Sequence, residues 1–306
     1  MAHLLDKFTS AFEACDYLFR EISRPVAGVF GLENLGPHFD VMVYSFVLFN
    51  LARTVFVPGL SRLFFNRIYG DLDRKTRNKW NCRGVSLIHV AFVIPLAIRC
   101  LDSPALSADR AFGWDERAGT LFAIAAGYFL WDTIDTITHF EAFGFVAHGS
   151  CHFADNRSVA RIYQRRSAGT ACFFVYFLCF RPFLAYYAVR CLLWEGSTIF
   201  LNLHWYMDKS GFSGSRIQLI NGCFLLLSFI ALRIIYGGFI SFEFFRTVLQ
   251  VRNEVPLAVS LYYACGNAVL QSLNWIWMIA ILKGFKKRMS GSEAKSEPQV
   301  SHRKLE

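Results

Sequence analysis

The sequence predicts an all-α fold, a polytopic bundle of about seven transmembrane helices around a polar-lined cavity. Of its 306 residues 54% are apolar and 17% aromatic, with a mean hydropathy of +0.33. A soluble domain has about 45–50% apolar residues. Charged residues make up only 18% of the chain and gather between long apolar runs. Polar residues inside those runs recur at helical spacing, which hydrocarbon tolerates only where they face protein or water.

Residues 1–40 mix charged and apolar side chains and show no cleavable signal peptide. The apolar residues that recur there at helical spacing are Leu5, Phe8, Phe12, Cys15, Phe19 and Ile22. This spacing predicts a short amphipathic helix lying on the membrane surface. It precedes a transmembrane domain over 41–285.

Apolar runs of about 20 residues are long enough to cross a bilayer. We predict seven such spans, at 41–60, 84–101, 118–138, 168–183, 184–206, 217–240 and 258–282. A basic loop is expected over 66–83. The polar tail over 286–306 is predicted to be disordered. Its Arg303 and Lys304 faintly match a dilysine signal for retrieval to the endoplasmic reticulum.

Basic residues concentrate in three segments, 62–83, 157–166 and 283–288. With seven spans, all three segments lie on the same side of the membrane. The positive-inside rule makes that side the cytosol, so the C-terminus is cytosolic and the N-terminus lumenal. The same rule explains the net charge of +9, so the sequence does not indicate a partner nucleic acid.

The third and fifth spans carry polar stripes. The residues at i, i+4, i+7 and i+11 of the third span are Tyr128, Asp132, Asp135 and His139. They share one helix face. Glu195 and Asn202 share a face of the fifth span, seven residues apart, beside Thr198. Such residues either line a functional cavity or make hydrogen bonds between helices. Arg53 in the first span and His89 in the second are expected to be satisfied packing residues.

The sixth and seventh spans also have polar faces. The polar residues on the face of the sixth span are Gln218, Asn221, Ser228, Arg233 and Tyr236. Those of the seventh are Tyr263, Asn267, Gln271 and Asn274. Arg233 lies in the middle of its span and needs a buried acid, either as part of a site or as a structural ion pair. The candidate acids are Asp132, Asp135 and Glu195. Four helices with polar faces predict a cavity that either holds amphiphiles or catalyses a reaction at a lipid head group.

The sequence predicts no cofactor and no metal. His148 and His152 have HxxxH spacing, but no second pair supplies the further ligands that a membrane di-iron site needs. The nine cysteines show no CxxC pair or zinc spacing, so we expect reduced thiols packed as small apolar side chains. Phosphate-binding and nucleophile-elbow motifs are also missing from the sequence.

Four segments resemble the TLC-domain membrane proteins, a family that includes the ceramide synthases, and in particular its fungal members of unassigned activity. The segments are KTRNKWNCRGVSLIH, YFLWDTIDTITHFEAFGFVAHG, RPFLAYYAVRCLLWEGSTIFLNLHWYMDKSG and GSRIQLINGCFLLLSFIALRIIYG. The resemblance covers residues 35–285. It implies an endoplasmic reticulum membrane, a central cavity between helices, and a role in lipid homeostasis with membrane lipids as partners.

Ceramide synthases of this family carry two adjacent histidines for acyl transfer from acyl-CoA to a sphingoid base. Here His148 is followed by Gly149, so one of the pair is missing. The resemblance therefore favours lipid binding, sensing or transport. The alternatives are an acyl-CoA-dependent N-acyltransferase in which His148 is catalytic, and a structural partner in membrane assembly. Compared with fungal relatives, residues 150–169 resemble an insertion, which is either a genuine cytosolic loop or an unspliced intron.

Overall fold

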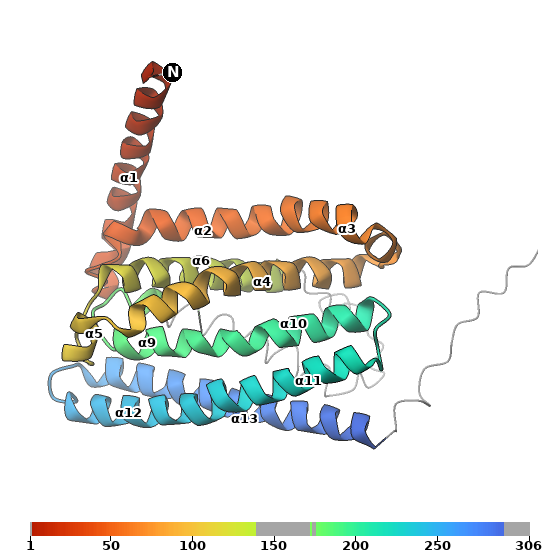
Figure 1. The fold of residues 1–306 in the computed structure, drawn as a ribbon. Helices are drawn as coiled ribbons and strands as arrows, with labels where there is room; N and C mark the ends of the chain where they lie inside the picture. Colours follow the sequence, from red (N-terminus) through yellow and green to blue (C-terminus); the bar gives the residue numbers. More distant parts are fainter. Residues whose placement is uncertain (1, 139–171, 173–175, 291–306) are drawn as a thin grey trace, which may run out of the picture.

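The computed structural model describes residues 2–138, 172 and 176–290, and every regular element in these ranges is helical. The predicted all-α bundle is therefore confirmed. Its long helices lie side by side, and only α1 (Ala2–Phe30) points away from them (Figure 1). His139, His148 and the predicted insertion at 150–169 fall outside the described residues.

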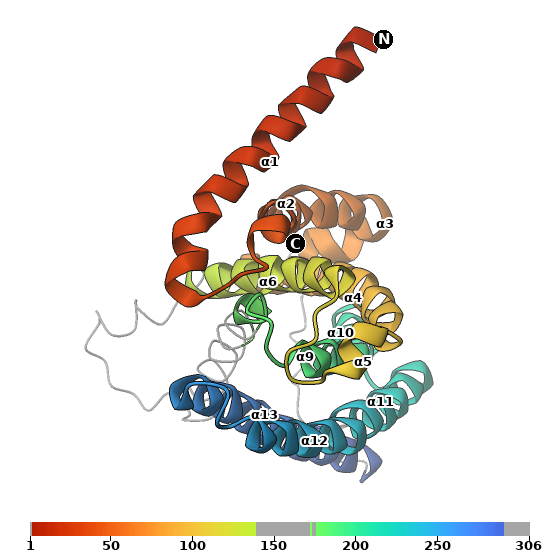
Figure 2. The ribbon, with the colours of Figure 1, turned by 90° about the vertical axis from the view of Figure 1, so that its left-hand side faces the viewer.

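The helix α1 runs across the long axis of the bundle rather than along it (Figures 1 and 2). Its 29 residues give a length of about 43 Å, so it is longer than the short helix predicted from the sequence. Phe19 packs edge-on against Phe39 and Tyr44, with ring centroids 6.3 and 5.7 Å away. After α1 the chain turns at Gly31, whose φ of 65° favours glycine. A surface position in the membrane remains a prediction for this helix.

The first half of the bundle contains η1 (Gly36–His38), α2 (Phe39–Leu51), η2 (Ala52–Phe56), α3 (Val57–Asp71), α4 (Arg74–Leu101), α5 (Pro104–Ala108) and α6 (Glu116–Thr138). The loop predicted over 66–83 is wrong, since only Leu72 and Asp73 separate α3 from α4. Charge does not by itself end a helix. The Asp73 carboxylate caps α4 by accepting the backbone N–H groups of Lys75 and Thr76 at 3.0 and 3.1 Å.

The second half contains α9 (Ala185–Leu192), η3 (Leu193–Glu195), α10 (Gly196–Lys209), α11 (Arg216–Phe229), η4 (Ile230–Tyr236), α12 (Gly237–Gln250) and α13 (Leu257–Met289). Seen from the end of the bundle, α9 and α10 lie between α4 and α6 on one side and α11 to α13 on the other (Figure 2). Residues of α9 and α10 are therefore in a position to contact both layers.

Four helices of the described chain are long and apolar enough to cross a membrane, at 36–71, 74–101, 216–250 and 257–286. The chain is therefore a membrane protein. The helix α6 runs beside them and is enclosed, because its side chains from Ala118 to Trp131 are mostly buried. Gly127 allows α2 close to α6, since a Cβ there would lie 2.6 Å from the Met42 carbonyl oxygen. Seven crossings remain a prediction, as part of the expected fourth span, 168–171 and 173–175, lies outside the described residues.

The two ends of the bundle differ in charge. Residues 62–83 at the turn between α3 and α4 include seven basic and two acidic residues, and 283–288 in α13 include four basic residues. Both segments lie at the same end (Figure 1). At the opposite end, residues 102–117 include four acidic and two basic residues. We refer to these as the basic end and the acidic end.

Candidate functional site

Arg233 is a buried cation in η4, with only 8% of its surface exposed. Its Nε donates a hydrogen bond to Ser197 Oγ at 2.9 Å. Its two terminal nitrogens donate to Asn274 Oδ1 at 3.2 Å and Thr198 Oγ1 at 3.3 Å. A carboxylate oxygen of Glu195 lies 3.5 Å from Nη2. Arg233 therefore connects the η3–α10 segment, η4 and α13.

Of the three acids considered as partners of Arg233, Glu195 is the one in ion-pair contact with it. The thiol of Cys172 lies close enough to Glu195, Arg233 and Asp132 to interact with their charges. Asp132 is partly buried on α6. These three charged residues therefore lie within electrostatic range of one half-buried thiol.

Asp135 belongs to a different contact. Its carboxylate lies 2.6 Å from Arg53 Nε, and it accepts a hydrogen bond from the Cys82 thiol at 3.2 Å. Arg53 also donates to Asn78 Oδ1 at 2.7 Å. Asp132 and Asp135 share a broad helix face but are about 60° apart on it, and they meet different helices. The predicted single stripe on α6 therefore serves two separate clusters.

Three charged residues of these clusters occupy irregular turns within long helices. Arg53 lies in η2 and Arg233 in η4, and both turns are π-helical. Glu195 is the last residue of the short 3₁₀ turn η3. Isolated π turns inside α-helices occur often at functional sites, because the wider turn redirects its side chains. A search at 3.6-residue spacing does not detect such a turn, so the sequence prediction missed all three.

Two other residues of the predicted cavity, Asn202 and Asn221, make hydrogen bonds between helices instead. Asn202 donates to Ser86 Oγ at 3.0 Å and accepts from Arg83 at 2.9 Å. Asn221 donates to the Phe200 carbonyl oxygen at 2.9 Å. For Asn202, this is the structural alternative that the sequence pattern of the fifth span left open.

Gln218 and Gln271 lie far from each other. Gln218 is at the basic end, where it accepts hydrogen bonds from the backbone N–H of Gly214 at 2.9 Å and from Arg288 at 2.7 Å. Gln271 donates to the Gly237 carbonyl oxygen at 2.9 Å and to Ser241 Oγ at 2.6 Å. The predicted cavity-lining residues therefore do not all face one space.

Several buried polar atoms have no hydrogen-bond partner in the part of the chain that the structure describes. Two belong to the surroundings of Arg233: Nδ2 of Asn274, whose Oδ1 accepts from Arg233, and Nε1 of Trp194, which precedes Glu195. A third, Oδ1 of Asn267, lies about two turns from Asn274 on α13. Asn274 and Trp194 are only 1% and 5% exposed. The indole nitrogen of Trp194 faces Gly237, where an added Cβ would lie 3.0 Å from it. An unsatisfied buried donor costs about 1–3 kcal/mol, so each one requires an explanation, such as a bound molecule.

The sequence prediction missed Trp194 and Ser197 because neither interrupts an apolar pattern strongly. A usable signal was a glycine next to each of them. Gly196 precedes Ser197 in the sequence, and Gly237 lies against Trp194 in the structure. Both glycines belong to spans that also carry a charged residue. Small residues let membrane helices approach closely enough for such contacts.

A model of the TLC domain matches residues 79–283. The chain belongs to the TLC-domain family. It is 33% identical over 283 residues to an uncharacterized TLC domain-containing protein of Schizosaccharomyces pombe, covering 92% of this chain and 90% of the relative. Arg233, Glu195 and Asn274 lie inside the matched segment, and Arg53 lies outside it.

Two further relatives are more distant. Topoisomerase I damage affected protein 4 of Saccharomyces cerevisiae is 26% identical over 256 residues, 82% of this chain and 85% of that protein. TLC domain-containing protein 4 of Homo sapiens is 28% identical over 233 residues, 72% of this chain and 80% of that protein. No solved structure matches the chain.

His89 of the TLC domain packs as predicted but is not satisfied. It is fully buried, and its ring stacks on Tyr128 with centroids 3.8 Å apart. Phe49 and Phe129 pack edge-on against it. Neither ring nitrogen has a hydrogen-bond partner among the described residues, which corrects the expectation of a satisfied histidine. The surrounding aromatic rings supply apolar contact.

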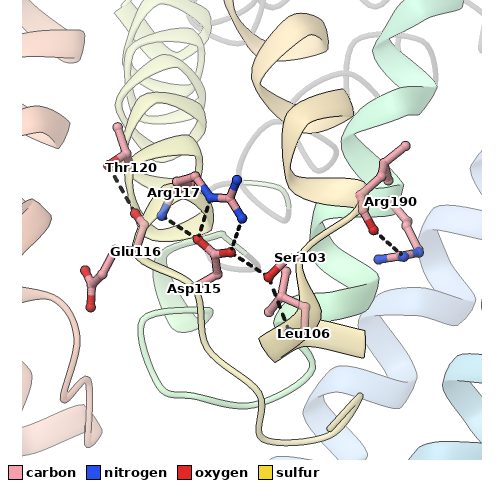
Figure 3. Close-up of polar contacts among 8 residues, drawn as sticks. Ser103, Leu106, Asp115, Glu116, Arg117, Thr120 and Arg190 are labelled. Atoms are coloured by element: carbon pink, nitrogen blue, oxygen red, sulfur yellow. Dashed lines mark hydrogen bonds and ion pairs between the residues drawn. The ribbon is translucent and has the colours of Figure 1, made fainter. Parts of the chain in front are cut away.

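A polar clamp at the acidic end holds the start of α6 (Figure 3). The Arg117 side chain donates to Asp115 at 2.8 and 3.2 Å, and the Arg117 backbone N–H donates at 2.8 Å. Ser103 Oγ donates to the same carboxylate at 2.5 Å. The Arg117 guanidinium, followed by Ser103, lowers the pKa of the Asp115 carboxyl from its ordinary value to about 2. This cluster is structural, because it ties the start of α5 to that of α6.

Two hollows are described, one at each end of the bundle. The hollow at the acidic end has a volume of 410 Å³ and lies between the segment 107–111 and α12. The hollow at the basic end has a volume of 260 Å³ and lies between α10, α11 and α13. Neither is lined by Arg233, Glu195 or Asp132, so the predicted central cavity remains a prediction. No group of three potential metal ligands occurs within the described residues.

Proposed function

We propose that this TLC-domain protein binds a membrane lipid by its polar head group inside the bundle, next to Arg233. Its role would be lipid handling in the endoplasmic reticulum membrane, by binding, sensing or transport. The observation that carries the proposal is the pair of buried N–H groups on Trp194 and Asn274 that have no acceptor in the described chain. Hydrocarbon offers no water to satisfy such groups, so a ligand with acceptor oxygens would stabilise them.

The charge of Arg233 supports the same proposal. Among the described residues its nearest carboxylate oxygen, from Glu195, is 3.5 Å away, whereas a charge-assisted hydrogen bond is about 2.7–2.9 Å long. Its other partners are the neutral oxygens of Ser197, Thr198 and Asn274. The guanidinium can therefore donate a hydrogen bond to a further oxygen atom from a ligand. A head group with hydroxyl, amide or phosphate oxygens has the required chemistry.

The proposal includes no bond-making step. Acyl transfer would need a base beside the attacking amine. His148, which the resemblance suggests for that role, lies outside the described residues. Lipid binding needs only the hydrogen-bonding groups that surround Arg233.

The test compares two tryptophan variants. Trp194→Phe removes an N–H that donates to nothing within the described chain, so loss of lipid would show that a ligand used it. Trp275→Phe is the matched control, since Trp275 is 56% exposed on the outer side of α13. Each protein is purified in mild detergent, and its lipids are identified by native mass spectrometry and lipidomics. Thermal unfolding confirms that both variants are folded.

We expect the unmodified protein to retain one lipid class above that lipid's share in the source membrane. Trp194→Phe should lower the occupancy by about tenfold, the effect of roughly 1.4 kcal/mol. Trp275→Phe should keep it. Equal retention by both folded variants, or no enriched lipid class in the unmodified protein, would contradict the proposal.

A further inference from the structure

The hollow at the basic end combines an apolar wall with a polar mouth. Its lining residues come from α10, the turn that follows it, α11 and α13. Leu219, Leu225, Ile281 and Phe285 supply the apolar part. At Gly284 an added Cβ would meet no atom within 4 Å, so this wall borders open space. The hollow is therefore wide enough at α13 to admit part of an amphiphile.

Arg288 stands at the mouth with its guanidinium held in place. It donates to Gln218 Oε1 at 2.7 Å and to the Ser215 carbonyl oxygen at 2.6 Å. Both acceptors are neutral. No carboxylate contacts Arg288 in the described part of the chain. Its positive charge is thus fixed in position but not neutralised, and a fixed guanidinium fork is well suited to bind a phosphate group.

The other charged and titratable groups at the hollow do not cancel this charge. Asp208 also lines it, but its carboxylate lies 3.0 Å from Lys209. His204 faces the hollow from α10. Lys283 and Lys286 are exposed on the opposite side of the last turns of α13. The local balance around the hollow is therefore positive.

The position of the hollow indicates what occupies it. Gln218 and Arg233 are 15 residues apart on one continuous helix, so the hollow is about 22 Å from the buried arginine. Its lining residues belong to the end of α10, the start of α11 and the end of α13, which lie at the basic end of the bundle (Figure 1). Lipid phosphates lie at this level of a bilayer, just outside the hydrocarbon core. Basic pockets between membrane helices bind anionic head groups.

We propose that this hollow binds an anionic phospholipid by its head group. Arg288 contacts the phosphate, while the glycerol and first acyl carbons pack against Leu219, Ile281 and Phe285. The site is separate from the one around Arg233 and does not depend on it. A zwitterionic lipid would bind less well, because its amine is repelled by the positive mouth.

The test uses purified protein in detergent with short-chain phosphatidic acid or phosphatidylcholine, and native mass spectrometry to count bound lipid. We expect phosphatidic acid to bind in preference, and Arg288→Gln to reduce its occupancy by about tenfold. Lys286→Gln removes the same charge from the outer side of α13 and should change the occupancy little. Equal binding of the two lipids, or equal loss in both variants, would overturn the proposal.

A second variant keeps the charge and fills the space. Gly284→Leu places a side chain in the hollow without a backbone clash, so phosphatidic acid should be excluded although Arg288 is present. Unchanged binding of phosphatidic acid would overturn the assignment of the binding site to this hollow. Inorganic phosphate at the same concentration should not displace the lipid. Displacement by phosphate alone would mean a site for free phosphate and would also overturn the lipid assignment.

Discussion

Two arginines inside the bundle, the half-buried Arg53 and the buried Arg233, are stabilised in different ways. Arg53 lies 2.6 Å from the Asp135 carboxylate, a short contact in which the acid neutralises the base. Arg233 lies 3.5 Å from Glu195 and makes its shorter hydrogen bonds to neutral oxygens. The guanidinium of Arg233 also lies over Trp277, 5.6 Å from the ring centroid. The first arrangement is that of a completed ion pair, whereas the second leaves capacity for a ligand.

We expect Arg233→Leu to lower the free energy of unfolding by about 3–5 kcal/mol, because Glu195 is left buried without its cation. Adding Glu195→Gln should recover much of that loss. The measurement is denaturant-induced unfolding in detergent. The matched cycle is Arg53→Leu with Asp135→Asn. The mixed pair, Arg233→Leu with Asp135→Asn, should be additive. Rescue of Arg233→Leu by Asp135→Asn rather than by Glu195→Gln would show that the pairing is wrong.

Asp115 links stability to pH at the acidic end of the bundle. Its pKa is lowered to about 2 in the folded protein, so the carboxylate stabilises the fold fully above its ordinary pKa of about 4. This contribution is lost as the pH falls from 4 towards 2. Asp115→Asn should therefore lower stability at pH 7 by about 1–2 kcal/mol, allowing for screening by water. Unfolding midpoints measured from pH 7 down to 2 should converge for the two proteins below pH 4, and a constant difference would refute the clamp.

At the scale of secondary structure, the irregular turns decide where the buried charges point. The turn η4 carries Arg233 and η2 carries Arg53, each between two regular α-helical halves. In a π turn the hydrogen bonds run from i to i+5, so the turn contains one residue more than an α turn. The extra residue changes the direction of a side chain inside the turn while both halves keep their packing.

Deleting Ala231 tests this account, because removing one residue from η4 restores α-helical geometry and keeps the register of α11 and α12. We expect the shortened protein to insert and fold, with a loss of thermal stability close to that of Arg233→Leu. Deleting Leu226 from the regular helix α11 is the control. It should abolish folding, since it rotates all preceding residues by about 100° relative to α12. Equal damage from the two deletions would rule out a special role for the π turn.

For the whole molecule, charge asymmetry between the ends predicts the orientation in the membrane. The basic end includes the turn between α3 and α4 and the end of α13, and the acidic end includes the turn between α12 and α13 (Figure 1). The positive-inside rule assigns the basic end to the cytosol. The lipid site proposed at Arg288 would then face the cytosolic leaflet.

Glycosylation tags can check this orientation. A tag with a flexible spacer inserted at residues 251–256 should be glycosylated, and the same tag after Glu306 should remain unmodified. Protein folding is verified by size-exclusion chromatography for both insertions. Glycosylation of the C-terminal tag would show that the protein has the opposite orientation, with the basic end in the lumen.

Part of the site could be predicted from the sequence and part could not. The sequence singled out Arg233 because a charge in the middle of an apolar span requires a partner. Glu195 was one of three candidate acids that lie on polar faces of predicted spans. The pattern could not select among them, because the choice depends on how α6, η3 and η4 approach one another. Asp135 lies on nearly the same face as Asp132, yet Arg53 is its partner.

Composition and the length of the apolar runs were enough to establish a helical membrane protein, because the bilayer leaves backbone groups few alternatives to a helix. Helix ends were less predictable. The helices α3 and α4 continue through the charged segment at 66–83, since an aspartate cap rather than charge decides where α4 begins. Helical spacing alone also could not place the π turns, whose side chains depart from the regular period. Contacts between distant helices decide which polar residues find a hydrogen-bond partner. Only the tertiary structure therefore distinguishes Asn202 and Asn221, which join helices, from Trp194 and Asn274, each of which keeps an N–H group without an acceptor in the described chain.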